Sequence, residues 1–150
     1  MIATKHLVPH VVTAGKDSTN LGWFAYQLIQ GKHGQTTAFT LAYLPVHNTR
    51  DDSSVYQQHL NYLHQEEVNR ALECPREALI TGLEQQMCEF QMKDYEVVVG
   101  LDANKDITEG PVAAMFARRD IKNAILEHYH NVTPPATYNC SWISIDAIFH

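Results

Sequence analysis

One segment in the second half of the chain constrains the fold more than any other. The run from Tyr95 to Leu101 reads YEVVVGL and is short, rich in β-branched residues and almost continuously apolar. This pattern is typical of a strand buried on both faces, because a strand with one solvated face alternates apolar and polar side chains. The segment therefore predicts a strand inside a layered domain.

Strands are also predicted in the first third of the chain. Two β-rich runs, at residues 22–29 and 36–45, flank a short loop that contains Gly31 and Gly34. Two such runs joined by a short glycine-containing loop are the pattern of a β-hairpin. A weaker strand is predicted at residues 7–13.

Helices are predicted on both sides of the buried strand. A first helix follows Ser53, where the apolar residues change to a helical period that continues to Leu72. A second begins at Pro75, because the fixed φ and missing N–H of proline suit the first helical position. The last elements are two short helices and a strand, predicted at residues 111–118, 121–129 and 143–149. This order predicts one α/β domain over residues 1–150.

The composition excludes several classes of protein. Of 150 residues, 45% are hydrophobic and 19% are charged, which excludes an intrinsically disordered chain. No apolar run approaches the ~20 residues of a membrane span. The three cysteines are widely spaced and no signal peptide follows Met1, so a reducing, intracellular compartment is favoured. The formal net charge of -6 excludes nucleic-acid binding by charge alone, so a phosphate substrate would need local help such as a metal ion.

The end of the buried strand carries the sharpest candidate site. Asp102 and Asn104 are two residues apart, so on a strand they share one face and lie ~6.6 Å apart along it. An acid and an amide that converge there suit metal-assisted phosphodiester hydrolysis, with Asp102 as base or metal ligand and Asn104 orienting a water. The alternative interpretation is a polar turn closing the strand. A calcium loop is excluded, because its sixth position needs Gly and is Ile107.

Other polar and aromatic residues favour structural roles. The histidine pairs lack the spacing of a zinc site and are interpreted as solvated or capping residues: His59 with His64, and His128 with His130. The scattered cations are interpreted as a soluble surface, among them Arg118, Arg119 and Lys122. Aromatic residues in strands are more often core than stacking platforms for bases, which applies to Trp23, Phe24 and Trp142.

Three short motifs occur together in a fixed order. They are Ala42-Tyr43-Leu44-Pro45, Gly100-Leu101-Asp102-Ala103-Asn104, and Ala136-Thr137-Tyr138 with Ile145-Asp146-Ala147-Ile148. In this set the chain resembles the endonuclease/exonuclease/phosphatase superfamily, metal-dependent phosphodiesterases that include pancreatic deoxyribonuclease and retrotransposon endonucleases. The resemblance implies an incomplete domain of the four-layer α/β sandwich of the DNase I-like type, without its N-terminal and C-terminal strands and with the second sheet only partly present.

The resemblance also implies roles for four residues. Asp102 matches the carboxylate that activates or positions the attacking water and would ligate Mg2+ or Mn2+, and Asn104 matches its amide partner. Tyr43 matches a residue near the scissile phosphate. Asp146 matches the Asp that orients the family's catalytic His.

The chain departs from the family pattern in several places. The metal-binding Glu and the catalytic His are expected outside residues 1–150, and the departures within the motifs are Leu101, Val46, Ser144 and Ala147. We therefore expect a fragment of a nucleic-acid phosphodiesterase that has little or no activity alone. Self-association through open sheet edges is also expected. The alternative is a noncatalytic module that binds another chain through such an edge.

Overall fold

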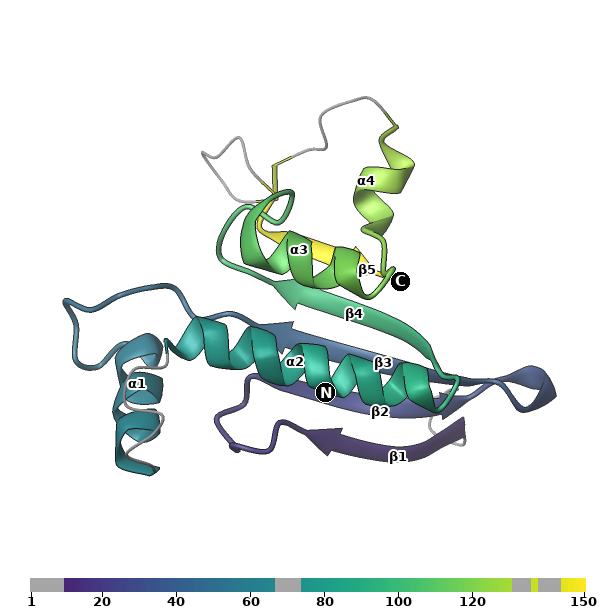
Figure 1. Cartoon of the computed structure of the whole chain (residues 1–150), viewed down its shortest axis with the longest axis horizontal. Coiled ribbons are helices and arrows are strands. Elements are labelled where there is room, and N and C mark those ends of the chain that lie inside the picture. Colours follow the sequence, from purple (N-terminus) through teal and green to yellow (C-terminus); the bar gives the residue numbers. More distant parts are fainter. Residues whose placement is uncertain (1–9, 67–73, 131–135, 138–143) are drawn as a thin grey trace.

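Five strands form one mixed sheet in the order β1-β2-β3-β4-β5 (Figure 1). The computed structural model describes residues 10–66, 74–130, 136–137 and 144–150. The strands are β1 (Val11–Lys16), β2 (Phe24–Gln30), β3 (Thr36–Tyr43), β4 (Glu96–Asp102) and β5 (Asp146–Phe149). The helices are η2 (Lys32–Gly34), α1 (Val55–Glu66), α2 (Pro75–Met92), α3 (Gly110–Arg118) and α4 (Ala124–His128). The pair β3 and β4 is parallel and the other neighbours are antiparallel, so the α/β prediction is confirmed.

The element boundaries differ from the sequence prediction mainly at the weakest signals. The first strand was predicted at residues 7–13, but β1 continues to Lys16 because pairing with β2 extends its backbone. The predicted helix at residues 121–129 shortens to α4, which Asn123 caps by accepting hydrogen bonds from two backbone N–H groups. The predicted last strand begins three residues later, at Asp146. Several predicted features lie outside the described residues: Val68, Ala71, Leu72, Tyr138 and Trp142.

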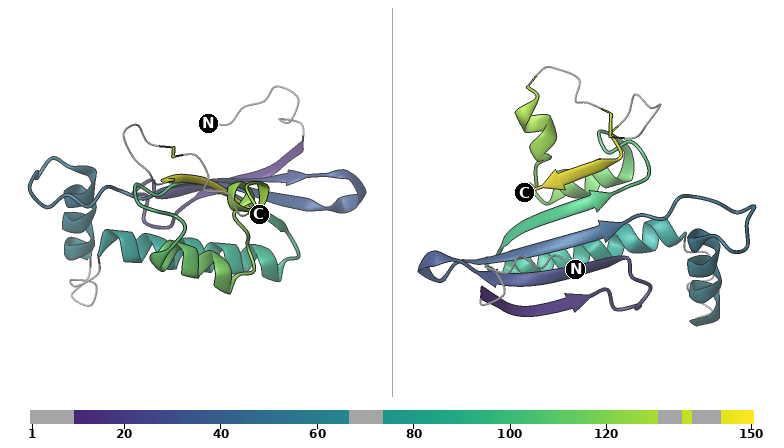
Figure 2. Two further views of the ribbon diagram at one scale, coloured as in Figure 1. Left: turned by 90° about the horizontal axis from the view of Figure 1, so that it is seen from above. Right: turned by 180° about the vertical axis from the view of Figure 1, so that it is seen from behind.

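The hydrophobic core lies between one face of the sheet and the helices α2 and α3. The left view of Figure 2 shows both helices on the same side of the sheet. From β4 the core receives Val97, Val99 and Leu101, which alternate along the strand. The helices contribute Leu79, Leu83, Met87, Phe90, Met115 and Phe116. Trp23 and Phe24 are buried, as predicted. No described helix is long and apolar enough to cross a membrane.

The opposite face of the sheet is not covered by a helix or a second sheet in the described part of the chain. On this open face Leu41 is 43% exposed and Ile148 is 52% exposed. Both lie beside Gly100, with which they are paired in register. Burial of β4 on both faces and a partly present second sheet were therefore wrong for the described residues, since all five strands form a single sheet.

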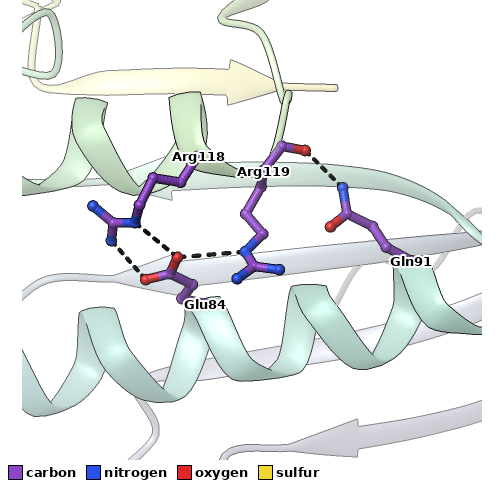
Figure 3. A network of polar contacts seen from close by, with 4 residues as sticks. All are labelled: Glu84, Gln91, Arg118 and Arg119. Atoms are coloured by element: carbon purple, nitrogen blue, oxygen red, sulfur yellow. Dashed lines mark hydrogen bonds and ion pairs between the residues drawn. The ribbon is translucent and has the colours of Figure 1, made fainter.

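A polar network joins α2 to α3 on the helix side (Figure 3). Arg118 donates two hydrogen bonds to the carboxylate of Glu84, at 3.0 and 2.7 Å, and Arg119 donates a third at 3.4 Å. The hydrogen bond from Arg118 is the main reason that the pKa of Glu84 is lowered. Gln91 donates to the backbone carbonyl of Arg119 at 2.8 Å. The two arginines therefore join the helices, whereas their scattered positions in the sequence predicted only a soluble surface.

Helix α1 is attached to the sheet through a buried histidine. The indole Nε1–H of Trp23 donates to Nδ1 of His59 at 2.9 Å, and His59 is 7% exposed. The nearby carboxylate of Asp17 is also buried and accepts hydrogen bonds from the backbone N–H groups of Leu21, Gly22 and Trp23. The interpretation of His59 as a solvated or capping residue was wrong, because its ring is buried against Trp23, the residue directly before β2.

Candidate active site

Three predicted site residues lie side by side across the sheet. Tyr43 at the end of β3 pairs in register with Asp102 at the end of β4, and Asp102 pairs with Asp146 at the start of β5. Side chains at paired positions point to the same face of a sheet. The core residues Ala42, Leu101 and Ala147 occupy the neighbouring positions and face the helices. The row Tyr43–Asp102–Asp146 therefore lies on the open face, and we call it the site row.

Asn104 lies just beyond the site row in a tight turn. Its φ is 48°, a left-handed conformation that Asn adopts more readily than most residues. Its backbone N–H donates to Oδ1 of Asp102 at 3.2 Å, and its side-chain Nδ2 donates to the carbonyl of Leu44 at 2.9 Å. The polar turn that was the alternative interpretation is present, and the same turn sets the direction of the Asn104 amide.

The loops after β3 and β4 are joined by several hydrogen bonds. The backbone N–H of Leu44 donates to the carbonyl of Asp102 at 2.8 Å. Arg76, in the first turn of α2, donates from Nη1 to the carbonyl of Pro45 at 2.7 Å and from Nη2 to the carbonyl of Ala103 at 2.9 Å. Burial of the guanidinium lowers the pKa of Arg76. The two loops therefore form one connected unit beneath Asn104.

The start of β5 is held by a residue of the third motif. The hydroxyl of Thr137 accepts hydrogen bonds from the backbone N–H groups of Ile145 and Asp146, at 2.9 and 3.1 Å. The backbone N–H of Ala103 donates to the carbonyl of Ile145 at 2.8 Å. These bonds hold the start of β5 next to the end of β4, where Asp146 pairs with Asp102.

The environment of Asp102 disfavours its charge. Partial burial is the largest cause that raises its pKa, and the negative charge of Asp146 raises it further. The hydrogen bond from the backbone N–H of Asn104 acts in the opposite direction. A carboxyl group whose ionised form is disfavoured by a neighbouring carboxylate gains from a nearby cation or from a proton shared with a ligand.

The oxygen donors in the site row suit a hard divalent cation, but only two of them are carboxylates. Magnesium is commonly held by one or two carboxylates with water and substrate phosphate completing an octahedral oxygen shell. Asp102 and Asp146 can supply the carboxylates, since they occupy paired positions of β4 and β5. No cluster of three or more His, Cys, Asp or Glu side chains with metal-binding geometry occurs within residues 10–66, 74–130, 136–137 and 144–150.

The structure brings together all four residues predicted for the site. Two supporting residues were missed. Arg76 has no spacing signal in the sequence, although a cation in the first turn of a helix, where acidic residues are favoured, is unusual enough to be noticed. Thr137 lies in the third sequence motif, but the motif did not predict that its hydroxyl holds the start of β5. The roles of Tyr43, Asp102, Asn104 and Asp146 stay predictions.

A comparison with protein-family models found no match, and a search of curated proteins found no similar sequence. Solved structures do match. The catalytic domain of human Nocturnin superposes with a TM-score of 0.57 at 14% identity, covering 93% of this chain and 47% of that one. The chain has the endonuclease/exonuclease/phosphatase fold.

Two further structures of this fold come from Bacteroides thetaiotaomicron. One is a mannosyl-6-phosphatase and the other an endonuclease/exonuclease/phosphatase family protein, each with a TM-score of 0.52 and 14% identity. The matches cover 93% of this chain and 51% and 50% of those chains. The chain thus spans about half the length of the endonuclease/exonuclease/phosphatase structures that it matches.

Proposed function

We propose that the site row is part of the catalytic centre of a phosphodiesterase that uses Mg2+ or Mn2+, with nucleic acid as the substrate class. The pairing of Tyr43, Asp102 and Asp146 in one register row is the observation that carries this proposal. The fold supports phosphate-ester chemistry, since one similar structure is a mannosyl-6-phosphatase. Nucleic acid as the substrate rests on the motif resemblance.

Each residue of the site has a chemical role in this proposal. Asp102 would ligate the cation and position or deprotonate the attacking water, because its carboxylate lies at the centre of the row. Asn104 orients that water with its amide oxygen, since the hydrogen bond from its NH2 group to the carbonyl of Leu44 fixes the direction of the amide. Tyr43 is 38% exposed beside Asp102 and can donate its hydroxyl to a phosphate oxygen. A bound divalent cation would supply charge stabilisation for the phosphate.

Asp146 has a different task. Its carboxylate lies next to Asp102, so it can share a cation or hold a partner that lies over the row. The site offers no cationic side chain in the row itself to stabilise the charge that develops on phosphate, and loss of one such donor can cost ~100-fold in rate. We therefore expect weak metal binding and activity near zero for residues 1–150 alone.

The metal-binding part of the proposal is tested by titrating the purified chain with Mn2+ and recording amide NMR signals. We expect paramagnetic broadening centred on Tyr43, Asp102 and Asp146, and its loss in Asp102→Asn. The control is Glu109→Gln, which removes an exposed carboxylate outside the row at the N-cap of α3. Broadening that is centred elsewhere, or that survives Asp102→Asn, would contradict the assignment of the site.

The activity is tested with the same proteins, supercoiled plasmid DNA and Mg2+ or Mn2+. We expect the chain to nick plasmid no faster than Asp102→Asn does. Metal-dependent nicking that Asp102→Asn abolishes and Glu109→Gln retains would establish the nuclease and contradict its expected inactivity as a single chain.

A second function is favoured by a different observation. The open face exposes apolar side chains such as Leu41 and Ile148, and β1 and β5 are edge strands. Exposed apolar patches and unpaired strand edges are typical of protein interaction surfaces. The alternative proposal is therefore a noncatalytic module that binds another protein chain, or a copy of itself, through this side of the sheet.

A further inference from the structure

Arg76 stands where a helix least favours a cation. Cys74 is the N-cap of α2 and Pro75 its first residue, so Arg76 lies in the first turn. The N-terminus of a helix carries partial positive charge, and acidic side chains such as Glu77 are preferred there. The guanidinium is also partly buried, which adds a cost of desolvation. Its position therefore calls for a compensating interaction.

The two carbonyl groups that Arg76 contacts supply that interaction. One belongs to Pro45, two residues beyond Tyr43, and the other to Ala103, directly after Asp102. Pro45 and Ala103 are both buried. Each carbonyl lies beyond the end of its strand, where the regular ladder no longer provides a donor, and a buried carbonyl without a donor is costly. One guanidinium thus joins the loops that follow β3 and β4.

Arg76 reaches these loops from behind the site. Helix α2 covers the core face of the sheet (Figure 2). The site row lies on the opposite face, because its neighbours along the strands point to the core. Both terminal nitrogens of the guanidinium are engaged with backbone carbonyls. The contacts of Arg76 with the two loops are thus made from the side of the sheet that α2 covers.

We propose that Arg76 is a positioning residue that clamps the loops after β3 and β4 and so sets the geometry of Asn104 and the site row. The hydrogen bonds from Leu44 to Asp102 and from Asn104 to Leu44 cross the same junction. If the two loops separate, both bonds lengthen and the Asn104 amide loses its fixed direction. The catalytic meaning of the clamp rests on the proposed function, but the clamp itself does not.

The planar fork of arginine suits this task better than other side chains. Its two terminal nitrogens diverge in a fixed geometry, so one group can donate to two carbonyls at once. Lysine carries its three donors on a single nitrogen, and glutamine carries two on a single NH2 group. Arg76→Lys therefore keeps the charge and most of the stem but loses the fork, while Arg76→Gln also loses the charge.

The clamp is tested by native-state hydrogen exchange of the full chain. We expect Arg76→Gln to accelerate exchange of the Leu44 and Ala103 amides by about tenfold or more, through local opening of the junction. Val99 in the middle of β4 serves as the reference amide. We also expect the side-chain NH2 signals of Asn104 to shift as its bond to Leu44 is lost. Arg76→Lys should show the same pattern to a smaller extent, and it serves as the test variant if Arg76→Gln does not fold.

The matched control is Arg118→Gln, which removes another hydrogen-bonded guanidinium that lies on α3 and contacts Glu84. This variant should leave the exchange rates of the Leu44 and Ala103 amides unchanged relative to that of Val99. The side-chain NH2 signals of Asn104 should not shift. A uniform loss of protection in Arg76→Gln, with unchanged Asn104 signals, would show a merely structural role and overturn the proposal. If the Leu44 and Ala103 amides of Arg76→Lys are as protected from exchange as in wild type, the proposal is also wrong, because a positive charge without the fork would then hold the loops together.

The Mn2+ titration separates this proposal from the proposed function. If the cation binds the site row, Arg76→Gln should weaken the broadening at Tyr43 and Asp102 and Arg118→Gln should not. If the broadening in Arg76→Gln equals that in wild type, the proposal that Arg76 sets the geometry of the site row is wrong. If the wild-type chain shows no broadening at the row, the proposed function fails, while the exchange experiment still decides whether Arg76 holds the loops.

Discussion

Asp102 is placed where its own charge is unfavourable. Burial and the charge of Asp146 both raise its pKa, and the single hydrogen bond from the N–H of Asn104 offsets this in part. A residue selected for stability alone would not combine a carboxylate with a second carboxylate in the adjacent register position. Such local destabilisation is common at functional sites, where activity and stability oppose each other.

We predict that Asp102→Asn stabilises the chain at neutral pH. Asparagine keeps an oxygen that can accept from the N–H of Asn104, but it has no charge to desolvate. Because the pKa of Asp102 is raised on folding, the destabilising effect grows as the pH rises through the unfolded value, near 4, and is complete above the folded value. In urea unfolding, the variant should therefore have a higher free energy of unfolding than wild type at pH 7, and this difference should vanish below about pH 3. A loss of stability at pH 7, or an equal gain with Glu109→Gln, would contradict this.

At the scale of elements, α1 depends on one buried polar contact. Trp23 donates its indole N–H to His59, and the backbone carbonyl of Trp23 accepts from the N–H of Tyr43 at 2.9 Å. The attachment of α1 and the end of β3 therefore share one residue. Burial lowers the pKa of His59, and the charge of Asp17 opposes this in part. The neutral ring is required, since only an unprotonated Nδ1 can accept the indole hydrogen.

We predict that His59→Phe lowers the free energy of unfolding at pH 7.5 by about 1–3 kcal/mol, because the buried indole N–H loses its acceptor. The pKa of His59 is lower in the folded than in the unfolded chain, so its contribution is complete above about pH 6.5 and decreases as the pH falls toward the folded value. The difference in free energy of unfolding between wild type and His59→Phe, measured by urea unfolding, should therefore decrease from pH 7.5 to pH 5. His64→Phe, at an exposed position of the same helix, should have little effect.

At the scale of the whole molecule, the described chain is a sheet with helices on one side. The helix side holds a continuous core, and Glu84 with Arg118 and Arg119 joins α2 to α3 over it (Figure 3). The opposite side exposes Leu41 and the site row together. In the described residues no second layer covers these apolar side chains.

We predict that the purified chain self-associates through the open face. Size exclusion with light scattering should give a mass above 17.0 kDa that rises with concentration. Leu41→Lys and Ile148→Lys should shift the chain toward the monomer, because each places a charge in the interface. The control is Met92→Lys, at an apolar position that is 82% exposed at the end of α2. A monomer at all concentrations, with a cooperative thermal transition, would contradict the prediction.

Local patterns were enough to place most elements of this chain. The β-branched run before Asp102 predicted β4, and Pro75 predicted the start of α2, because side-chain periodicity and backbone restrictions act over a few residues. The same reasoning put Asp102 and Asn104 at a strand end. The limits of β1, α4 and β5 were less accurate, since cross-strand pairing and capping decide where weak elements begin and end.

The sequence by itself determined which residues can form strands and helices, and which short motifs carry acids and amides at strand ends. The tertiary structure decided that Tyr43, Asp102 and Asp146 share one row, because the register between distant strands depends on the packing of the whole sheet. It also decided the roles of Arg76 and His59, whose partners lie 27 to 36 residues away along the chain. No local pattern encodes a contact of that separation, so these residues become visible once the chain is folded.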